Sequence, residues 1–144
     1  MLFRSALIEA ARRQELARTL SGLAGAGVDA LVLKGAGLAY THYAAPYLRP
    51  CLDMDLLVER KRVETATTVL EAMGYRRQIS LSRDAVHTQA TFERTVGTFD
   101  HIVDLHWAIS NRPLFANMLS FAELAAGAVP VRSEERRVGK ECRL

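Results

Sequence analysis

The sequence has few of the features that mark secreted, disulfide-bonded or membrane-spanning proteins. It contains only two cysteines among 144 residues, which form no disulfide framework. No uninterrupted apolar run reaches the roughly 20 residues that a membrane-spanning helix needs. The N-terminal stretch mixes arginine and glutamate into its apolar positions, unlike a signal peptide. These absences predict a cytoplasmic protein that does not enter a membrane.

The chain also lacks a strong excess of charge of one sign. Its net charge is +3, but residues 132–144 hold five basic and three acidic residues, which leaves 14 basic and 13 acidic residues in 1–131. A nearly neutral body without a basic stripe argues against nucleic-acid binding. With 49% hydrophobic and 24% charged residues, the composition is typical of one globular domain large enough to bury a core.

Residues 132–144 differ in character from the rest of the chain. Eleven consecutive residues, RSEERRVGKEC, resemble the translation of a common sequencing-adapter oligonucleotide. We therefore predict that 132–144 is a non-native tail and that 1–131 is a domain core truncated at its C-terminus. The alternative is a native, solvated tail, and finding these codons in genomic DNA would establish it.

Apolar periodicity predicts alternating helices and strands. Spacings of three and four residues indicate helices, and strict alternation indicates half-buried strands. We expect helices at about 1–23, 36–43, 61–73 and 113–126, and strands at about 28–33, 52–58, 75–81, 86–93 and 102–107. The last two strands flank a turn at Gly97 and are close enough to form an antiparallel hairpin. The predicted fold class is α/β (α+β), with a mixed β-sheet flanked by helices.

Two acidic residues interrupt an apolar strand. Asp53 and Asp55 are separated by one residue, so their side chains point to the same face, about 6.6–7 Å apart along the strand. Neighbouring carboxylates repel each other unless a positive charge lies between them, and Mg²⁺ prefers such oxygen ligands. The alternative is that this D-x-D pair binds no metal, since the pattern is common in loops.

Asp104 repeats the pattern in a second apolar strand. If the two strands are neighbours, three carboxylates converge, which suits a site for two metal ions. Alone, an acid such as Asp104 is more often capped or paired than bound to a metal. The two-metal hypothesis therefore requires that Asp53, Asp55 and Asp104 face one another across adjacent strands.

A strand, a glycine and a helix start follow one another at Lys34, Gly35 and Ala36. Glycine lets the backbone approach a ligand closely, and the N-terminus of a helix favours an anion. Lys34 would add a positive charge, although it can equally be a surface residue. We interpret this segment as a phosphate-binding turn.

In order and spacing, four segments of the sequence resemble the uncharacterised nucleotidyltransferase family of the DNA polymerase β-like superfamily, of bacterial type. The matching segments are VLKGAGLAYTHY, LRPCLDMDLLV, MGY and VDLHW, within residues 28–107. The resemblance implies metal ligation by Asp53, Asp55 and Asp104 and phosphate binding by the Lys34–Ala36 turn and Arg49. Ala36 departs from the superfamily pattern, which has Gly or Ser there.

The resemblance also implies a reaction. A nucleoside monophosphate would be transferred from a nucleoside triphosphate, with ATP expected, to an unknown small-molecule, peptide or protein acceptor with the help of two Mg²⁺ ions. The alternative function is an inactive binding module with the same fold, such as an antitoxin-like partner. The presence of all three acids favours the enzyme.

Two aromatic residues next to Asp104 remain open to interpretation. His106 shares a strand face with Asp104 and is expected to contact a phosphate or one of the carboxylates, or simply to hydrogen-bond near the end of the sheet. Trp107 points to the opposite face, where packing in the core is favoured over base stacking.

Overall fold

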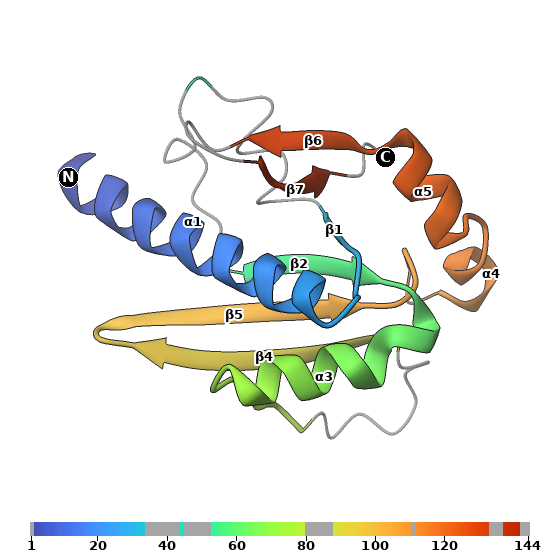
Figure 1. Cartoon of the computed structure of the whole chain (residues 1–144), viewed down its shortest axis with the longest axis horizontal. Helices are drawn as coiled ribbons and strands as arrows, with labels where there is room; N and C mark the ends of the chain where they lie inside the picture. The colour runs from blue at the N-terminus through green and yellow to red at the C-terminus, as the bar shows by residue number, and fades with distance from the viewer. Residues whose placement is uncertain are drawn as a thin grey trace.

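The structure, a computed structural model, describes residues 2–33, 44, 53–79, 88–110, 112–132 and 137–141. Within these ranges the chain forms a mixed β-sheet with helices on both of its faces (Figure 1). Among the described helices, none is both long and apolar enough to cross a membrane. The α+β class expected from the sequence is confirmed.

The described strands form one seven-stranded sheet in the order β3-β4-β5-β2-β1-β7-β6. Two neighbouring pairs, β2 with β5 and β1 with β7, are parallel, and the other pairs are antiparallel. The strands are β1 (Ala30–Val32), β2 (Asp53–Val58), β3 (Arg76–Arg77), β4 (Gln89–Val96), β5 (Phe99–His106), β6 (Val129–Arg132) and β7 (Arg137–Glu141). This arrangement confirms a mixed sheet and the antiparallel β4–β5 hairpin.

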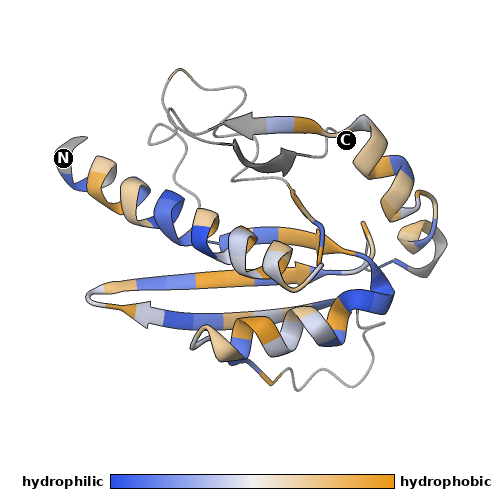
Figure 2. Ribbon diagram, in the orientation of Figure 1, coloured by the Kyte–Doolittle hydropathy of each residue, from blue (hydrophilic) through white to orange (hydrophobic). Residues whose placement is uncertain are grey.

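Helices α1 and α3 cover one face of the sheet, and α5 packs on the other. Figure 2 shows apolar residues along the strands and helices that face one another, and a hydrophilic segment at η2. The helical segments are α1 (Leu2–Gly25), the 3₁₀ helix η2 (Arg60–Arg62), α3 (Val63–Ala72), α4 (Pro113–Ala116) and α5 (Phe121–Gly127).

Strand β2 contributes side chains to the cores on both faces of the sheet, because successive side chains of a strand point to opposite faces. Met54, Leu56 and Val58 belong to the larger core under α1 and α3. Leu57 belongs to the smaller core under α5. Alternation therefore puts Asp53 and Asp55 on the same face as Leu57, away from α1 and α3.

Two glycines end elements where the sequence predicted. Gly74, the residue expected to follow the helix over 61–73, has φ +93°, and Gly97, in the hairpin turn, has φ +61°. Both lie in the left-handed region that favours glycine.

The single helix expected over 113–126 is wrong, because the chain forms two short helices there. Ser120 caps α5: its hydroxyl accepts the Glu123 backbone N–H at 3.2 Å, and the Glu123 carboxylate accepts the Ser120 N–H at 2.8 Å. This capping box satisfies N–H groups at a helix start and so begins a new helix. The serine-x-x-glutamate spacing was the sequence signal for it.

Other expectations are met in part or fall outside the described residues. Of the expected strand 75–81 the structure describes residues 75–79, and within these only residues 76–77 form a strand, β3. The expected helix at 36–43 lies outside the described residues. Residues 137–141 form β7, between β1 and β6, within the segment predicted to be a non-native tail. The genetic origin of that segment stays a prediction.

Candidate metal centre

Three carboxylates meet on the sheet face opposite α1 and α3. Strands β2 and β5 run parallel with Asp55 paired to Asp104, so both side chains point the same way. Asp53, Asp55 and Asp104 each offer one oxygen within 4.8 Å of the others. The convergence that the two-metal hypothesis requires is therefore present.

Asp55 is the most buried of the three, with 6% of its surface exposed. Its Oδ1 lies 2.7 Å from Nε2 of His106, which is 5% exposed. His106 occupies the same face of β5 as Asp104 and is paired with Leu57 of β2. Of the contacts expected for His106, the structure contains the one to a carboxylate, and its contact with a phosphate stays a prediction.

Asp104 is held from the neighbouring strand. Thr91 is its cross-strand partner on β4, and the Thr91 hydroxyl donates a hydrogen bond of 2.5 Å to Asp104 Oδ1. Thr91 is not among the site residues predicted from the sequence. The hairpin register could have identified it. A two-residue turn at Gly97 fixes which residues of the two strands pair, and in that register Thr91 lies opposite Asp104.

The donor set fits a hard divalent cation. All three groups are carboxylates, which are the ligands that Mg²⁺ and Mn²⁺ prefer, and Asp53 and Asp104 are only half-buried. Three like charges this close repel one another, so a cation between them would stabilise the charged forms. Neighbours that orient the carboxylates, as Thr91 and His106 do, are typical of metal sites.

The predicted phosphate-binding residues cannot be placed beside this cluster. Lys34, Gly35, Ala36 and Arg49 lie outside the described residues. What the structure describes is the end of β1, where the Leu33 backbone N–H donates to the Asp55 carbonyl oxygen at 2.8 Å. Phosphate binding by the segment that follows stays a prediction.

Trp107 packs against the core beneath α1 and α3 and is only partly buried. It therefore points away from the carboxylates, as the alternation along β5 predicts.

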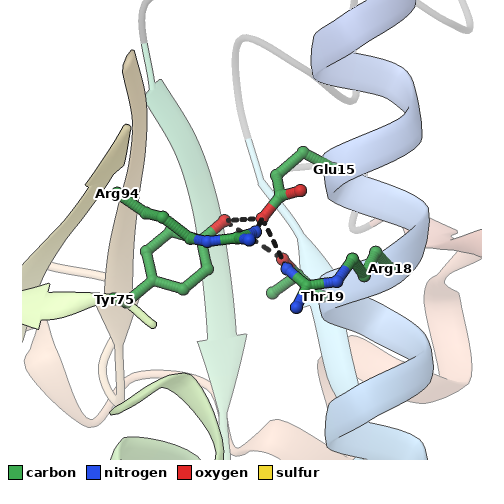
Figure 3. Close-up of polar contacts among 5 residues, drawn as sticks. All are labelled: Glu15, Arg18, Thr19, Tyr75 and Arg94. Atoms are coloured by element: carbon green, nitrogen blue, oxygen red, sulfur yellow. Dashed lines mark hydrogen bonds and ion pairs between the residues drawn. The ribbon is translucent and has the colours of Figure 1, made fainter. Parts of the chain in front are cut away.

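A second polar cluster lies on the opposite face of the sheet (Figure 3). Glu15 of α1 accepts hydrogen bonds from Tyr75 at 2.9 Å, Arg94 at 2.6 Å and Arg18 at 3.1 Å. Burial raises the pKa of Glu15, but the hydrogen bonds from Tyr75 and Arg94 outweigh it and leave the pKa below its usual value. The cluster ties α1 to β4 and to the segment after α3.

The chain matches the model of a family described as an uncharacterised nucleotidyltransferase over residues 3–140. The protein belongs to this uncharacterised nucleotidyltransferase family. The matched range contains all three aspartates. The chain has no significant match among curated proteins or among solved structures.

Proposed function

We propose that this nucleotidyltransferase moves a nucleoside monophosphate from a nucleoside triphosphate to a hydroxyl-bearing acceptor and uses two divalent ions. The observation that carries the proposal is the convergence of Asp53, Asp55 and Asp104 within 4.8 Å. Family membership supports the reaction class. Folds alone do not fix function, so the site has to be tested directly.

The reaction balances without an additional reactant. The acceptor oxygen attacks the α-phosphorus, a new P–O bond forms, and the bond to the β-phosphate oxygen breaks to release pyrophosphate. The acceptor proton passes to the Asp104 carboxylate and then to solvent. Lys34, Gly35 and Arg49 are proposed to neutralise the phosphates.

The carboxylates have distinct tasks. Asp53 and Asp55 would hold both Mg²⁺ ions, and Asp104 would complete the site. When bound, two such ions supply positive charge to the attacking and leaving oxygens. His106 keeps Asp55 in one orientation and Thr91 does the same for Asp104, so the ligands are preorganised.

Calorimetric titration of the full chain tests this proposal. ATP, GTP, CTP and UTP are titrated with and without Mg²⁺ into the wild type and an Asp53→Asn, Asp55→Asn double variant. We expect Mg²⁺-dependent binding of at least one nucleotide that the double variant loses. Asp100→Asn is the matched control, because Asp100 lies on β5 but is exposed and hydrogen-bonded to Thr95.

Two results would contradict the proposal. Nucleotide binding that is equal in the double variant would show that the carboxylates are not needed. A folded wild type that binds no nucleotide would instead favour the inactive binding module. Circular dichroism of each variant separates loss of binding from loss of fold.

A further inference from the structure

A pocket of about 440 Å³ opens at the carboxyl ends of β2 and β5. Its walls come from η2, from the segment after β5, and from the α4–α5 region. Ligands of sheet proteins commonly bind beyond the carboxyl ends of parallel strands, and a pocket of this volume suits a small molecule.

The pocket begins one side-chain position beyond the carboxylates. Leu57 lines it and follows Asp55 by two residues on the same face of β2, about 7 Å along the strand. Leu57 is also the cross-strand partner of His106, which contacts Asp55. The pocket therefore lies next to the carboxylates along this face of β2.

Strand β1, which precedes the predicted phosphate turn in the sequence, runs in the other direction along the sheet. Strand β1 is antiparallel to β2 and ends beside Asp55, so it runs toward Asp53 and away from the pocket. Lys34 and Gly35 follow β1 in the sequence. A triphosphate bound on that side would leave the pocket side open to the attacking oxygen. In-line displacement requires this arrangement, because the attacking and leaving oxygens lie on opposite sides of the phosphorus.

The apolar residues of the lining favour a ligand whose larger part is apolar. Leu57, Ile109 and Leu124 provide aliphatic surface, and Trp107 and Phe121 provide rings. Apolar lining with a few polar groups is typical of sites that bind ring-containing small molecules.

Most of the polar lining groups already contact one another. Lys61 pairs with Glu59 at 3.0 Å, and Ser120 and Glu123 form the capping box. Among the described residues of the lining, Arg60 and Asn117 remain to hydrogen-bond a ligand. The pocket therefore presents apolar surface with two polar anchors, Arg60 and Asn117.

We propose that this pocket binds the acceptor, and that the acceptor is a small alcohol or phenol with an apolar ring body. This assignment rests on the proposed nucleotidyl transfer. The ring packs against the apolar lining, which includes Trp107 and Phe121. The hydroxyl points along the face of β2 toward Asp55 and Asp104, where it attacks the α-phosphorus.

Trp107 provides the readout, because it is the only tryptophan in the chain and lines the pocket. The full chain is titrated with phenylpropanol, cyclohexylethanol and tyrosol while tryptophan emission is recorded. Ala122→Phe fills the pocket from an exposed position of α5. Ala126→Phe is the matched control, since Ala126 is exposed on the same helix and does not line the pocket.

We expect a saturable change of emission in the wild type and in Ala126→Phe, and affinity at least about tenfold weaker in Ala122→Phe. Mg²⁺-dependent nucleotide binding should be unchanged in Ala122→Phe. With α-labelled ATP, label should appear in the alcohol in the wild type and at a much lower level in Ala122→Phe.

Other outcomes overturn the assignment. If Ala122→Phe loses nucleotide binding, the pocket holds the nucleobase, and the proposed transfer survives without this acceptor site. If no alcohol changes the emission, the pocket does not take this class of ligand. If alcohols bind but the wild type binds no nucleotide, it is the proposed transfer that fails.

Discussion

At the scale of single residues, each of two carboxylates has an orienting neighbour of a different kind. The hydroxyl of Thr91 donates to Asp104, and the imidazole of His106 contacts Asp55. Such neighbours fix the rotamers of ligand side chains before an ion arrives, and so reduce the entropy lost on binding.

Removing the Thr91 hydroxyl should weaken the metal site without removing a ligand. In Thr91→Val, Asp104 loses its hydrogen bond while the strand keeps a β-branched residue of similar shape. We expect Mn²⁺ affinity to fall by about tenfold or more, as for other residues that orient ligands. Electron paramagnetic resonance of free Mn²⁺ measures the change.

Thr95→Val is the matched control for that variant. Thr95 donates to Asp100 at 2.7 Å on the same two strands, in an exposed pair away from the cluster. An equal loss of Mn²⁺ affinity in both variants would mean that the effect comes from the strand rather than from Asp104.

Glu15 should make the stability of the fold depend on pH. Burial raises its pKa, but the hydrogen bonds from Tyr75 and Arg94 leave the folded-state pKa below the unfolded value of 4.5. A lowered pKa gives stability that is fully present above the unfolded value and is lost as pH falls through the folded value. Glu15→Gln should therefore be destabilising at neutral pH, and its difference from the wild type should shrink in acid.

Urea denaturation at a series of pH values measures that difference in the free energy of unfolding. Glu71→Gln, at an exposed position of α3, is the control and should show little difference at any pH. A Glu15→Gln difference that stays constant down to acidic pH would contradict the expectation.

At the scale of elements, periodicity predicted the strands that carry the carboxylates well. The apolar residues around Asp53, Asp55 and Asp104 were sufficient to predict β2 and β5. One or two acids inside an apolar strand do not obscure its hydrophobic pattern. Periodicity alone missed the break between α4 and α5, where the Ser120–Glu123 capping box starts a new helix. Local hydrogen bonding decided that boundary.

The turn after α3 should be sensitive to a single methyl group. Gly74 has φ +93°, and an added Cβ would lie 3.3 Å from Nε of Arg94. We expect Gly74→Ala to lower the free energy of unfolding by about 1–2 kcal/mol, the cost of a left-handed conformation for other residues. Thermal or urea denaturation measures it.

Gly25→Ala is the control for that turn. Gly25 ends α1, and an added Cβ there meets no atom within 4 Å. This change should be neutral or slightly stabilising, because alanine favours the helix. A loss of stability comparable to that of Gly74→Ala would show that the φ angle of Gly74 is not the cause.

At the scale of the whole molecule, the carboxylates and the C-terminal strands lie in different parts of the sheet. Asp53, Asp55 and Asp104 are on β2 and β5, whereas β7 and β6 lie beyond β1. We expect a chain of residues 1–131 to keep its Mn²⁺ affinity. It should also self-associate more than the full chain, because losing β7 uncovers the edge of β1.

Mn²⁺ titration and size-exclusion chromatography of the two chains test this expectation. Loss of Mn²⁺ binding by a folded 1–131 chain would mean that β7 supports the site through β1. Sequencing of the genomic locus separately tests the predicted origin of residues 132–144.

The acceptor pocket could not be predicted from the sequence. Its lining comes from β2, η2, the segment after β5, and α4–α5, and no periodicity relates side chains so far apart in the chain. The carboxylate cluster was predictable, because it requires only that two regular strands, β2 and β5, are neighbours in the sheet. The phosphate turn at Lys34–Ala36 remains a prediction from sequence.

The parallel pairing of β2 with β5 also bears on how the protein folds. The β4–β5 hairpin closes across a short turn, whereas His106 and Asp55 are 51 residues apart, so their contact costs more chain entropy and should form later. A slip of one residue between β2 and β5 would turn Asp104 to the opposite face. Ion capture during refolding would then report the choice of the correct register between β2 and β5.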